Sequence, residues 1–375
     1  PVQLPFKAGE VLATGAELKN TFCLTRDEFA FLSQHIGDME NLETLDHFEA
    51  SIDLYRHLFR IEPDLFAYDL HPDYASTEYA GRVWKCERQV SVQHHQAHIA
   101  SCLVDNGWQT DDGPVIGVAW DGTGYGTDGH VWGGEFFVGD YEGFRRAAHL
   151  EYLPMPGGEA AIRSPWRLAL GYLYALTGRS PTLPGVGDEE MRIVRQQVDQ
   201  GLNAPLTSAA GRLFDAVAAL IGIRQRVSYE AQAAIEMEML ATQWTAKEPT
   251  EQTGAYPFAV EYGRDPLQIR LRELLVAVQA DMDEGTSPAQ IGFRFHLTLA
   301  ELILEVCQRL ASETNLRTVA LSGGCFQNRL LLALTVPRLE ETGFRVLLHR
   351  QAPCNDGGIS VGQAAMAGFA ALKVP

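Results

Sequence analysis

The sequence predicts an α/β protein, in which helices cover a mixed or parallel sheet. Two observations predict this class. Short apolar runs of strand length alternate along the chain with segments whose apolar residues recur at helical spacing. The chain has 375 residues, of which 46% are hydrophobic. This size allows a large core divided between two lobes, because single cores tend to stop growing near ~250–300 residues.

The first part of the chain alternates between strands and helices. Short strands separated by turns are expected within residues 10–34, followed by a helix over 43–59, a strand over 64–70, a helix over 72–83 and a strand over 88–93. A further helix is expected over residues 94–107, where HHQAHIASCLVDNG ends on Asn106-Gly107, a common stop signal.

A second unit is expected to begin at Pro114. The run PVIGVAWDGTGYG predicts a strand that leads into a glycine-rich turn, and VWGGEFFVGDY and FRRAAHLEYL predict the next two strands. Three consecutive strands with a turn after the first resemble the opening of the chain, which indicates a weak structural repeat. Residues 164–311 are expected to be mostly helical, with a loop at 245–257, and strands and helices alternate again after them.

The composition excludes several classes of function. The formal charge of −18 comes from 30 basic and 48 acidic side chains, and it disfavours nucleic-acid binding. None of the six cysteines forms a CxxC pair, so a zinc ribbon or redox motif is not indicated, and reduced thiols in the cytoplasm are expected. No apolar run reaches membrane-spanning length and no signal peptide is visible. A start at proline suggests a fragment or a processed chain.

The strongest candidate for chemistry is the run QHHQAH. His94 and His98 are four residues apart on an expected helix, so both imidazoles lie on one face, where one metal ion reaches both. The alternative is a pair of surface histidines. The metal hypothesis is favoured because this helix opens just after an apolar strand and because carboxylates occur in suitable loops elsewhere. His95 points elsewhere and has no assigned role.

Asp121, in AWDGTGYG, is the first expected carboxylate partner. It ends an apolar strand, and the following Gly122, Thr123 and Gly124 would let backbone N–H groups approach phosphate oxygens while the carboxylate binds a metal ion. The alternative is a hairpin turn, for which Asp-Gly is the commonest sequence.

Asp356, in CNDGGISVGQAA, is the second expected partner. It opens the last helix together with two glycines, and there it could present a carboxylate to a metal ion. The alternative is an ordinary N-cap, which is the favoured role when the residue is taken alone.

The segment LSGGCFQNRLL predicts an anion or nucleotide site. An apolar strand ends in Ser322-Gly323-Gly324 and leads into a helix with Asn328, so backbone amides at a helix start are available to a phosphate. It is not a Walker loop, because the Gly-Lys-Ser/Thr sequence is missing.

Further candidates surround these motifs. Gly157, Gly158 and Glu159 form a loop before a helix, where Glu159 could reach a ligand or pair with Arg163. Asp215 lies within an apolar helix face and needs a partner, either a nucleotide sugar or a basic side chain.

Three other side chains are candidates for roles in chemistry. Glu230, at the start of another helix, is favoured as structural, as is Asp215. Cys325 and Cys354 stand beside glycine loops but are also favoured as structural, since no histidine can be assigned to either.

Six motifs, in order, resemble the C-terminal carbamoyltransferase part of the HypF family of hydrogenase maturation proteins. They are QHHQAH, WDGTGYG, PGGEAAIRSPWR, TSAAGRLFDAVAAL, LSGGCFQNRLL and CNDGG, and the resemblance covers essentially the whole chain. The chain is similar, more distantly, to the tRNA threonylcarbamoyladenosine transferase TsaD and to antibiotic O-carbamoyltransferases. The resemblance implies a two-lobed actin/Hsp70/sugar-kinase-like fold. Residues 1–110 would form the first lobe and 111–375 the second, with a mostly helical insertion over about 164–311.

The resemblance also implies a metal-dependent carbamoyltransferase. It assigns the catalytic metal to His94, His98, Asp121 and Asp356, and a nucleotide to the glycine loops. Two nitrogen and two oxygen ligands suit iron(II), zinc or manganese, of which iron(II) and zinc are favoured. Carbamoyl-adenylate would be made from carbamoyl phosphate and ATP in a YrdC-like domain. Its carbamoyl group would pass to the C-terminal cysteine of HypE, towards the cyanide ligands of the [NiFe] hydrogenase iron. The acylphosphatase-like, zinc-finger and YrdC-like segments of HypF do not occur in this sequence.

Two other functions remain as alternatives. One is a carbamoyl or threonylcarbamoyl transferase with another acceptor, a sugar hydroxyl or tRNA. The acidic charge and the spacing of the histidine run argue against tRNA. The other is a non-catalytic nucleotide-binding scaffold, which would not need four metal ligands.

Overall fold

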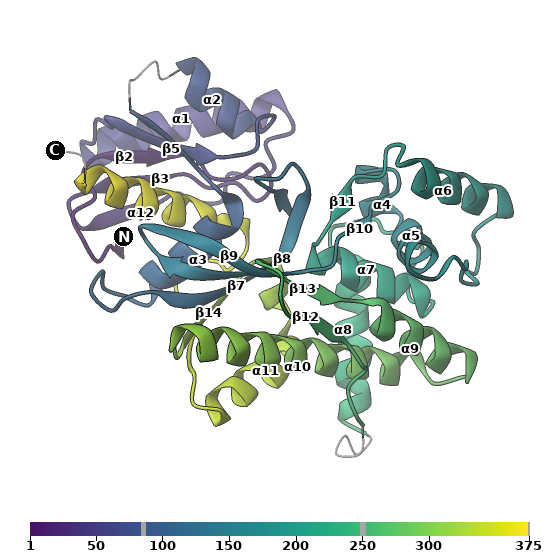
Figure 1. The fold of residues 1–375 in the computed structure, drawn as a ribbon. Helices are drawn as coiled ribbons and strands as arrows, with labels where there is room; N and C mark the ends of the chain where they lie inside the picture. The colour runs from purple at the N-terminus through teal and green to yellow at the C-terminus, as the bar shows by residue number, and fades with distance from the viewer. Residues whose placement is uncertain (84–87, 248–252, 374–375) are drawn as a thin grey trace.

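The computed structural model describes residues 1–83, 88–247 and 253–373, and it contains two β-sheets with helices around and between them (Figure 1). The expected two-lobed α/β class is confirmed. Cys86 and part of the loop expected at 245–257 lie outside the described residues. The other cysteines are free thiols.

The first sheet has the strand order β1-β4-β3-β2-β5-β6. Strands β2, β3 and β4 are antiparallel neighbours, and β5 and β6 continue the sheet parallel to β2. The bounds are β1 Val2–Gln3, β2 Val11–Ala13, β3 Cys23–Arg26, β4 Phe29–Leu32, β5 Leu65–Asp69 and β6 Gln89–Val92.

The second sheet follows the order β12-β13-β9-β8-β7-β14-β15, and the short β10 and β11 pair beside it. Strands β7, β8 and β9 are antiparallel, and β14 and β15 run parallel to β7. The bounds are β7 Val115–Tyr125, β8 Val131–Asp140, β9 Gly143–Leu150, β10 Leu153–Pro154, β11 Leu206–Thr207, β12 Ala259–Glu261, β13 Leu267–Arg270, β14 Thr318–Ser322 and β15 Arg345–Leu347.

The two sheets share one topology. In each, three consecutive antiparallel strands are followed by two strands that are added in parallel on the other side of the first. The repeat that the sequence indicated is therefore present in the structure. The central strand β7 is buried from Val115 to Trp120, as expected for an apolar run covered on both faces.

The helices follow the expected segments. Their bounds are α1 Leu42–Phe59, α2 Ala75–Val83, α3 His94–Asp105, α4 Glu159–Arg163, α5 Trp166–Thr177, α6 Asp188–Gln200, α7 Ala210–Leu220, α8 Gln232–Thr245, α9 Arg272–Asp283, α10 Pro288–Thr314, α11 Arg329–Glu341 and α12 Ile359–Leu372. Local sequence sets their starts: the Asn41 side chain accepts a hydrogen bond from Thr44 N, and the Ser287 hydroxyl accepts one from Gln290 N.

Helices α3 and α12 pack against each other between the two sheets (Figure 1). Helix α3 follows the first sheet but contacts β7 and β14 of the second, and α12 follows the second sheet but contacts β2 and β5 of the first. Glycine makes this seam possible, because a Cβ on Gly362 would lie 1.9 Å from the carbonyl oxygen of Ala97. The two lobes are therefore joined by an exchange of their last helices.

Three details differ from the sequence expectations. The glycine-rich segment after Asp121 is not a turn, because β7 continues through it to Tyr125, with a register irregularity between Trp120 and Gly124. Residues 164–311 are mostly helical but also supply β12 and β13 to the second sheet. The end of the chain returns to the first sheet through α12, whereas residues 111–375 were all expected in the second lobe.

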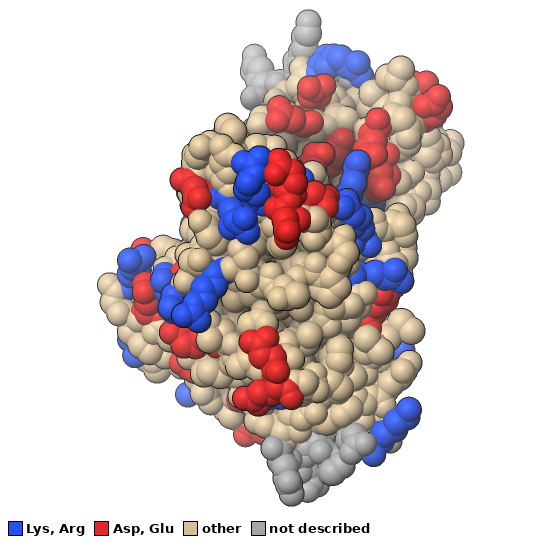
Figure 2. Space-filling view, turned by 90° about the vertical axis from the view of Figure 1, so that its right-hand side faces the viewer, with Lys and Arg blue, Asp and Glu red and all other residues tan. Residues whose placement is uncertain are grey.

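The surface carries mixed charge. On the face shown in Figure 2, basic side chains stand in small groups, many of them beside acidic ones, and no broad positive patch covers this face. Among residues 1–83, 88–247 and 253–373, no helix is long and apolar enough to cross a membrane.

Candidate metal centre and adjoining cavity

His94 and His98 project from the first turns of α3, which begins directly after β6. The Gln93 side chain caps this helix by accepting hydrogen bonds from the backbone N–H groups of His95 and Gln96, at 2.8 and 3.1 Å. Both imidazoles are buried, and their Nε2 atoms face the same point. The expected helical spacing therefore brings the two nitrogens together.

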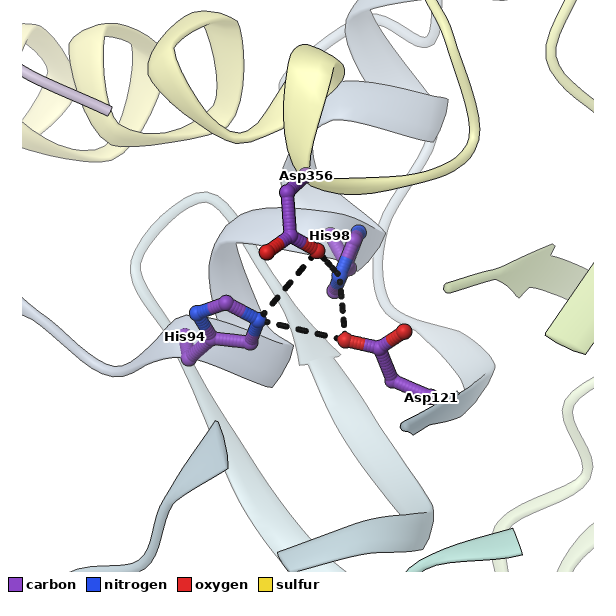
Figure 3. Close-up of side chains that lie close together, drawn as sticks. All are labelled: His94, His98, Asp121 and Asp356. Carbon is purple, nitrogen blue, oxygen red and sulfur yellow. Dashed lines mark hydrogen bonds and ion pairs between the residues drawn. The ribbon is translucent and has the colours of Figure 1, made fainter. Parts of the chain in front are cut away.

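Asp121 and Asp356 complete the cluster from two other elements (Figure 3). The Asp121 Oδ2 atom lies 3.3 Å from Nε2 of His94 and 3.4 Å from Nε2 of His98. The Asp356 Oδ1 atom lies 3.8 and 3.7 Å from the same two nitrogens. One ligand atom from each residue lies within 4.8 Å of all the others. The four nitrogen–oxygen separations of 3.3–3.8 Å suit donors that share one ion at roughly 2.0–2.2 Å from each.

The electrostatics of the four residues also fit a cation. Burial and the charge of Asp121 raise the pKa of Asp356 to about 8. Burial would raise the pKa of Asp121 too, but hydrogen bonds with His94 and His98 bring it well below its usual value. Two buried carboxylates this close repel each other, and a divalent cation removes that repulsion. Two nitrogens and two oxygens suit iron(II), zinc or manganese.

Asp69 orients His94 and was missed at the sequence level. Its Oδ2 atom lies 2.8 Å from Nδ1 of His94, and both side chains are fully buried. Burial lowers the pKa of His94, but the charge of Asp69 and the hydrogen bonds to Asp121 and Asp69 more than offset this and raise the pKa well above its usual value. A carboxylate on the far nitrogen of a histidine is a common support for a metal ligand. The available signal was an aspartate at the end of the apolar strand β5.

The Ser322–Gly324 turn positions Asp121. The Gly324 N–H donates to Asp121 Oδ1 at 2.9 Å, which leaves Oδ2 facing the histidines. The Gly323 N–H donates to the carbonyl oxygen of Cys354. A Cβ on Gly324 would lie 2.7 Å from Asp121 Oδ1. These two amides, which were expected to bind phosphate, therefore donate their hydrogen bonds to oxygen atoms of the protein itself.

Asp356 is held by a supported loop. Asp105, at the end of α3, accepts hydrogen bonds from the backbone N–H groups of Gln351 and Ala352, at 2.9 and 3.2 Å. The cap of the short 3₁₀ helix η2 (Asp356–Gly358) is the Asn355 side chain, which accepts from Gly357 N. The capping role considered for Asp356 therefore belongs to its neighbour, and the Asp356 carboxylate is free to face the histidines.

A cavity of about 420 Å³ opens beside the cluster. It is lined by seven of the residues expected at the site, together with side chains that were not expected there. The expected residues are Asp121, Gly122, Thr123, Asp215, Gly324, Asn328 and Asp356. The metal cluster and the candidate nucleotide site therefore share one space.

Arg212 and Asp215 form a buried pair in the cavity wall. Arg212 Nη2 lies 2.7 Å from Asp215 Oδ2, and their side chains are 6% and 4% exposed. Of the two partners considered for Asp215, a nucleotide sugar or a basic side chain, the structure provides the basic side chain of Arg212. Asn328 caps α11 by accepting a hydrogen bond from Leu331 N, and its Nδ2 atom lies 2.9 Å from Nε2 of His296.

Other expected residues lie away from this cavity. Gly157 and Gly158 adopt positive φ angles of 96° and 56° before α4, and Glu159 is exposed. None of these three lines the cavity, although Ile162 of the same helix does. Ser322 is fully buried, and its hydroxyl lies 2.8 Å from Nε2 of His349. Gly124 makes room for the histidines, because a Cβ there would lie 2.5 Å from the His95 ring.

His95 is not a ligand of the cluster. Its Nδ1 atom lies 3.1 Å from Nε2 of Gln93, and its buried Nε2 atom has no hydrogen-bond partner in the structure. Burial and the charge of His94 hold the pKa of His95 well below its usual value. The middle histidine is therefore a neutral packing residue against Gly124.

The thiols near the site are not activated. Burial and the charge of Asp121 raise the pKa of Cys325 well above its usual value. The same causes raise the pKa of Cys354 to about 11. A thiol needs a lowered pKa to act as a nucleophile near neutral pH. Both cysteines therefore fit the structural role that the sequence favoured.

Comparison with known proteins identifies related chains. The family model described as HypF Kae1-like domain matches residues 7–105, and that described as Carbamoyltransferase, Kae1-like Domain, second subdomain matches residues 117–363. Carbamoyltransferase HypF2 of Cupriavidus necator is 39% identical over 396 residues, which cover 96% of this chain and 47% of that protein. A carbamoyltransferase HypF homolog of the same organism is 39% identical over 363 residues. This alignment covers 94% of this chain and 90% of that protein.

The fold has a solved counterpart. The crystal structure of full-length HypF in the phosphate- and nucleotide-bound form superposes with a TM-score of 0.90 at 39% identity, over 98% of this chain and 57% of that one. The chain spans about half the length of the first curated relatives that it matches.

Proposed function

Because the chain belongs to the HypF family, we propose that it transfers a carbamoyl group from carbamoyl-adenylate to the C-terminal cysteine of HypE. The product would lead to the cyanide ligands of the [NiFe] hydrogenase iron. The observation that carries the proposal is the convergence of His94, His98, Asp121 and Asp356 at the edge of a cavity large enough for a ligand. A scaffold without chemistry would not need this donor set.

We assign one divalent cation, iron(II) or zinc, to these four residues. When bound, it supplies positive charge for the phosphate of carbamoyl-adenylate and stabilises the charge that develops as AMP leaves. Asp69 holds His94 in the orientation that turns Nε2 towards the cluster, and the Gly324 amide does the same for Asp121 Oδ2. The protein thereby fixes the ligands before the substrate arrives.

The nucleotide is assigned to the cavity. Its walls combine apolar side chains such as Phe214 and Ile235 with polar groups such as Asp215 and Asn328, a composition usual for ligand pockets. The phosphate- and nucleotide-bound state of the solved HypF relative supports this assignment. The phosphate end of the ligand would face Asp121 and Asp356, and the nucleoside would extend along α7 and α8.

The transfer step needs no nucleophile from this chain. The thiolate of the acceptor attacks the carbamoyl carbon, a C–S bond forms, and the C–O bond to the phosphate breaks. The electron pair of that bond leaves with AMP, and the thiol proton passes to solvent. The raised pKa of Cys325, caused first by burial, keeps this cavity thiol from competing with the acceptor.

The adenylation half-reaction is assigned elsewhere. The longer relatives contain about as much sequence again as this chain covers. We place the formation of carbamoyl-adenylate from carbamoyl phosphate and ATP in a YrdC-like domain of that remaining part. This chain alone should therefore not form the intermediate.

A direct assay tests the proposal. The metal-loaded chain is mixed with preformed carbamoyl-adenylate and a peptide of the HypE C-terminus, and mass spectrometry measures carbamoylation of the cysteine. The same peptide with serine in place of cysteine is the control. Transfer to a sugar hydroxyl or tRNA but not to the peptide would overturn the acceptor. Nucleotide binding without transfer to any acceptor would favour a scaffold.

A further inference from the structure

The two carboxylates of the candidate metal centre come from separate elements. Asp121 lies on β7, and Asp356 follows the loop of residues 348–355 that leaves β15. Oδ2 of Asp121 and Oδ1 of Asp356 both face the Nε2 atoms of the histidines (Figure 3). Two carboxylates this close repel each other until a cation is bound. The loop therefore needs contacts that hold Asp356 near Asp121.

His349 stands at the beginning of that loop, and its imidazole is buried. Its Nε2 atom lies 2.8 Å from the hydroxyl oxygen of Ser322, at the end of β14. Its Nδ1 atom lies 3.7 Å from Oδ2 of Asp105, at the end of α3. The side chains of His349 and Asp105 are 5% and 0% exposed, and Ser322 is fully buried. A fully buried hydroxyl cannot reach a substrate, so this Ser322–His349–Asp105 line is not a nucleophilic triad.

The line connects the elements that carry the metal ligands. Ser322 opens the turn whose amide binds Asp121 Oδ1. Asp105 ends α3, the helix whose first turns carry both histidines, and it also accepts hydrogen bonds from backbone N–H groups of the loop. His349 itself belongs to the loop that leads to Asp356. The imidazole therefore contacts the supports of all three ligand-bearing elements.

The His349 imidazole is neutral, so its two nitrogens have different roles. Burial lowers the pKa of His349 to about 4, although the charge of Asp105 opposes this shift. A neutral imidazole has one N–H group. The nearby carboxylate favours the proton on Nδ1, so that Nε2 accepts a hydrogen bond from the Ser322 hydroxyl. A buried hydroxyl without a partner is unfavourable, and this bond therefore resists separation of the loop from β14.

We propose that His349 is a positioning residue, which ties the Asp356 loop to the Asp121 turn and holds the two carboxylates at the spacing of one cation. This inference rests on the proposed metal centre. His349 does not touch the cation or the substrate, and it acts through Ser322 and Asp105. Because the loop is already in place when the cation arrives, binding needs little rearrangement and the metal affinity is higher.

The experiment measures metal affinity and coordination geometry separately from transfer. Competition with a chromophoric chelator gives the Kd of zinc, and the visible spectrum of the cobalt(II)-loaded chain reports the geometry of the ligands. His349→Leu should raise the zinc Kd about tenfold and change the cobalt spectrum, because the loop loses its bond to Ser322. His349→Gln, whose amide can still bond with the Ser322 hydroxyl, should retain most of the affinity.

A double-mutant cycle and a matched control separate positioning from general stability. Ser322→Ala should raise the zinc Kd by a similar factor, and its addition to His349→Leu should have little further effect, because both changes break one bond. His149→Leu is the control. That imidazole is also buried, with Nδ1 2.8 Å from the carbonyl oxygen of Leu150. His149→Leu should lower the free energy of unfolding but leave the zinc Kd and the cobalt spectrum unchanged.

The outcomes are distinguishable. An unchanged zinc Kd and cobalt spectrum in His349→Leu would overturn the positioning role, and so would equal losses of affinity in His349→Gln and His349→Leu. The same loss in His149→Leu would overturn it in favour of a general loss of stability. A wild-type chain that binds neither zinc nor cobalt would overturn the proposed metal centre, and this inference with it. Failure of carbamoyl transfer alone would overturn the proposed reaction, because no step of this experiment uses the carbamoyl donor or acceptor.

Discussion

The two lobes share a strand order but place the proposed metal ligands differently. In the first lobe, β6 runs straight into α3, and His94 and His98 stand on a helix whose geometry fixes their separation. In the second lobe, residues 348–355 separate β15 from η2, and Asp356 is placed by a loop that Asp105 supports. A helix therefore positions ligands by its own periodicity, whereas a loop positions them only through contacts with distant residues.

The largest effect is expected from removing one ligand of either kind. His94→Ala and Asp356→Ala should each reduce metal content and carbamoyl transfer to background. Three donors no longer hold the cation, and without it the charge of the remaining buried carboxylates is uncompensated. Added metal should raise the melting temperature of the wild-type chain but not of either variant. His35→Ala, at an exposed histidine, is the control. Normal transfer by a metal-free variant would contradict the role of the metal.

The contact between helices α3 and α12 links the helix-borne histidines to the loop-borne Asp356. Gly362→Ala should destabilise the chain by roughly 3 kcal/mol, because the new methyl group would overlap the Ala97 carbonyl oxygen at 1.9 Å. Gly81→Ala in α2, where a Cβ meets nothing within 4 Å, should instead stabilise by about 0.5–1 kcal/mol. Urea unfolding measures both. Equal stability of the two variants would show that the seam is not tightly packed.

The same contrast explains what the sequence could predict. His94 and His98 were predictable because a spacing of four fixes one helical face, and Asp121 because it directly follows an apolar run. The expected turn at Gly122–Gly124 was wrong, because strand pairing with β8 extends β7 past a sequence typical of turns. Asp69 and Arg212 reach the site only through sheet order and lobe packing, which depend on residues far away in the chain.

The glycines show the same limit. Gly124, Gly323 and Gly324 were expected to face phosphate, because Gly124 follows an apolar run and the other two precede a helix start, both places where backbone amides can bind a ligand. In the structure they allow close approach of the His95 ring, Trp120 and Asp121. A glycine in a sequence therefore indicates close approach of another group, but it does not indicate whether that group is a ligand or part of the protein.

The next largest effect on metal affinity is expected from Asp69, which orients the helix-borne His94. Asp69→Asn keeps a hydrogen-bond acceptor for His94 but removes the charge, and it should weaken metal affinity by roughly 10–100-fold. Competition with a chromophoric chelator measures the affinity. Asp73→Asn, at an exposed position near the same strand end, should leave it unchanged. An unaltered affinity in Asp69→Asn would mean that the helix alone orients His94.

The support of the loop-borne ligand should give the smallest effect. Asp105→Asn makes the same chemical change as Asp69→Asn, but it acts on backbone amides rather than on a ligand. The neutral oxygen still accepts one hydrogen bond, so the loss of stability should be about 1–2 kcal/mol. Asp111→Asn is the exposed control. Metal affinity should fall less than in Asp69→Asn, because Asp356 keeps its place at the start of η2, which the Asn355 side chain caps. An equal or larger fall would show that the loop-borne ligand depends on its support as strongly as the helix-borne pair does.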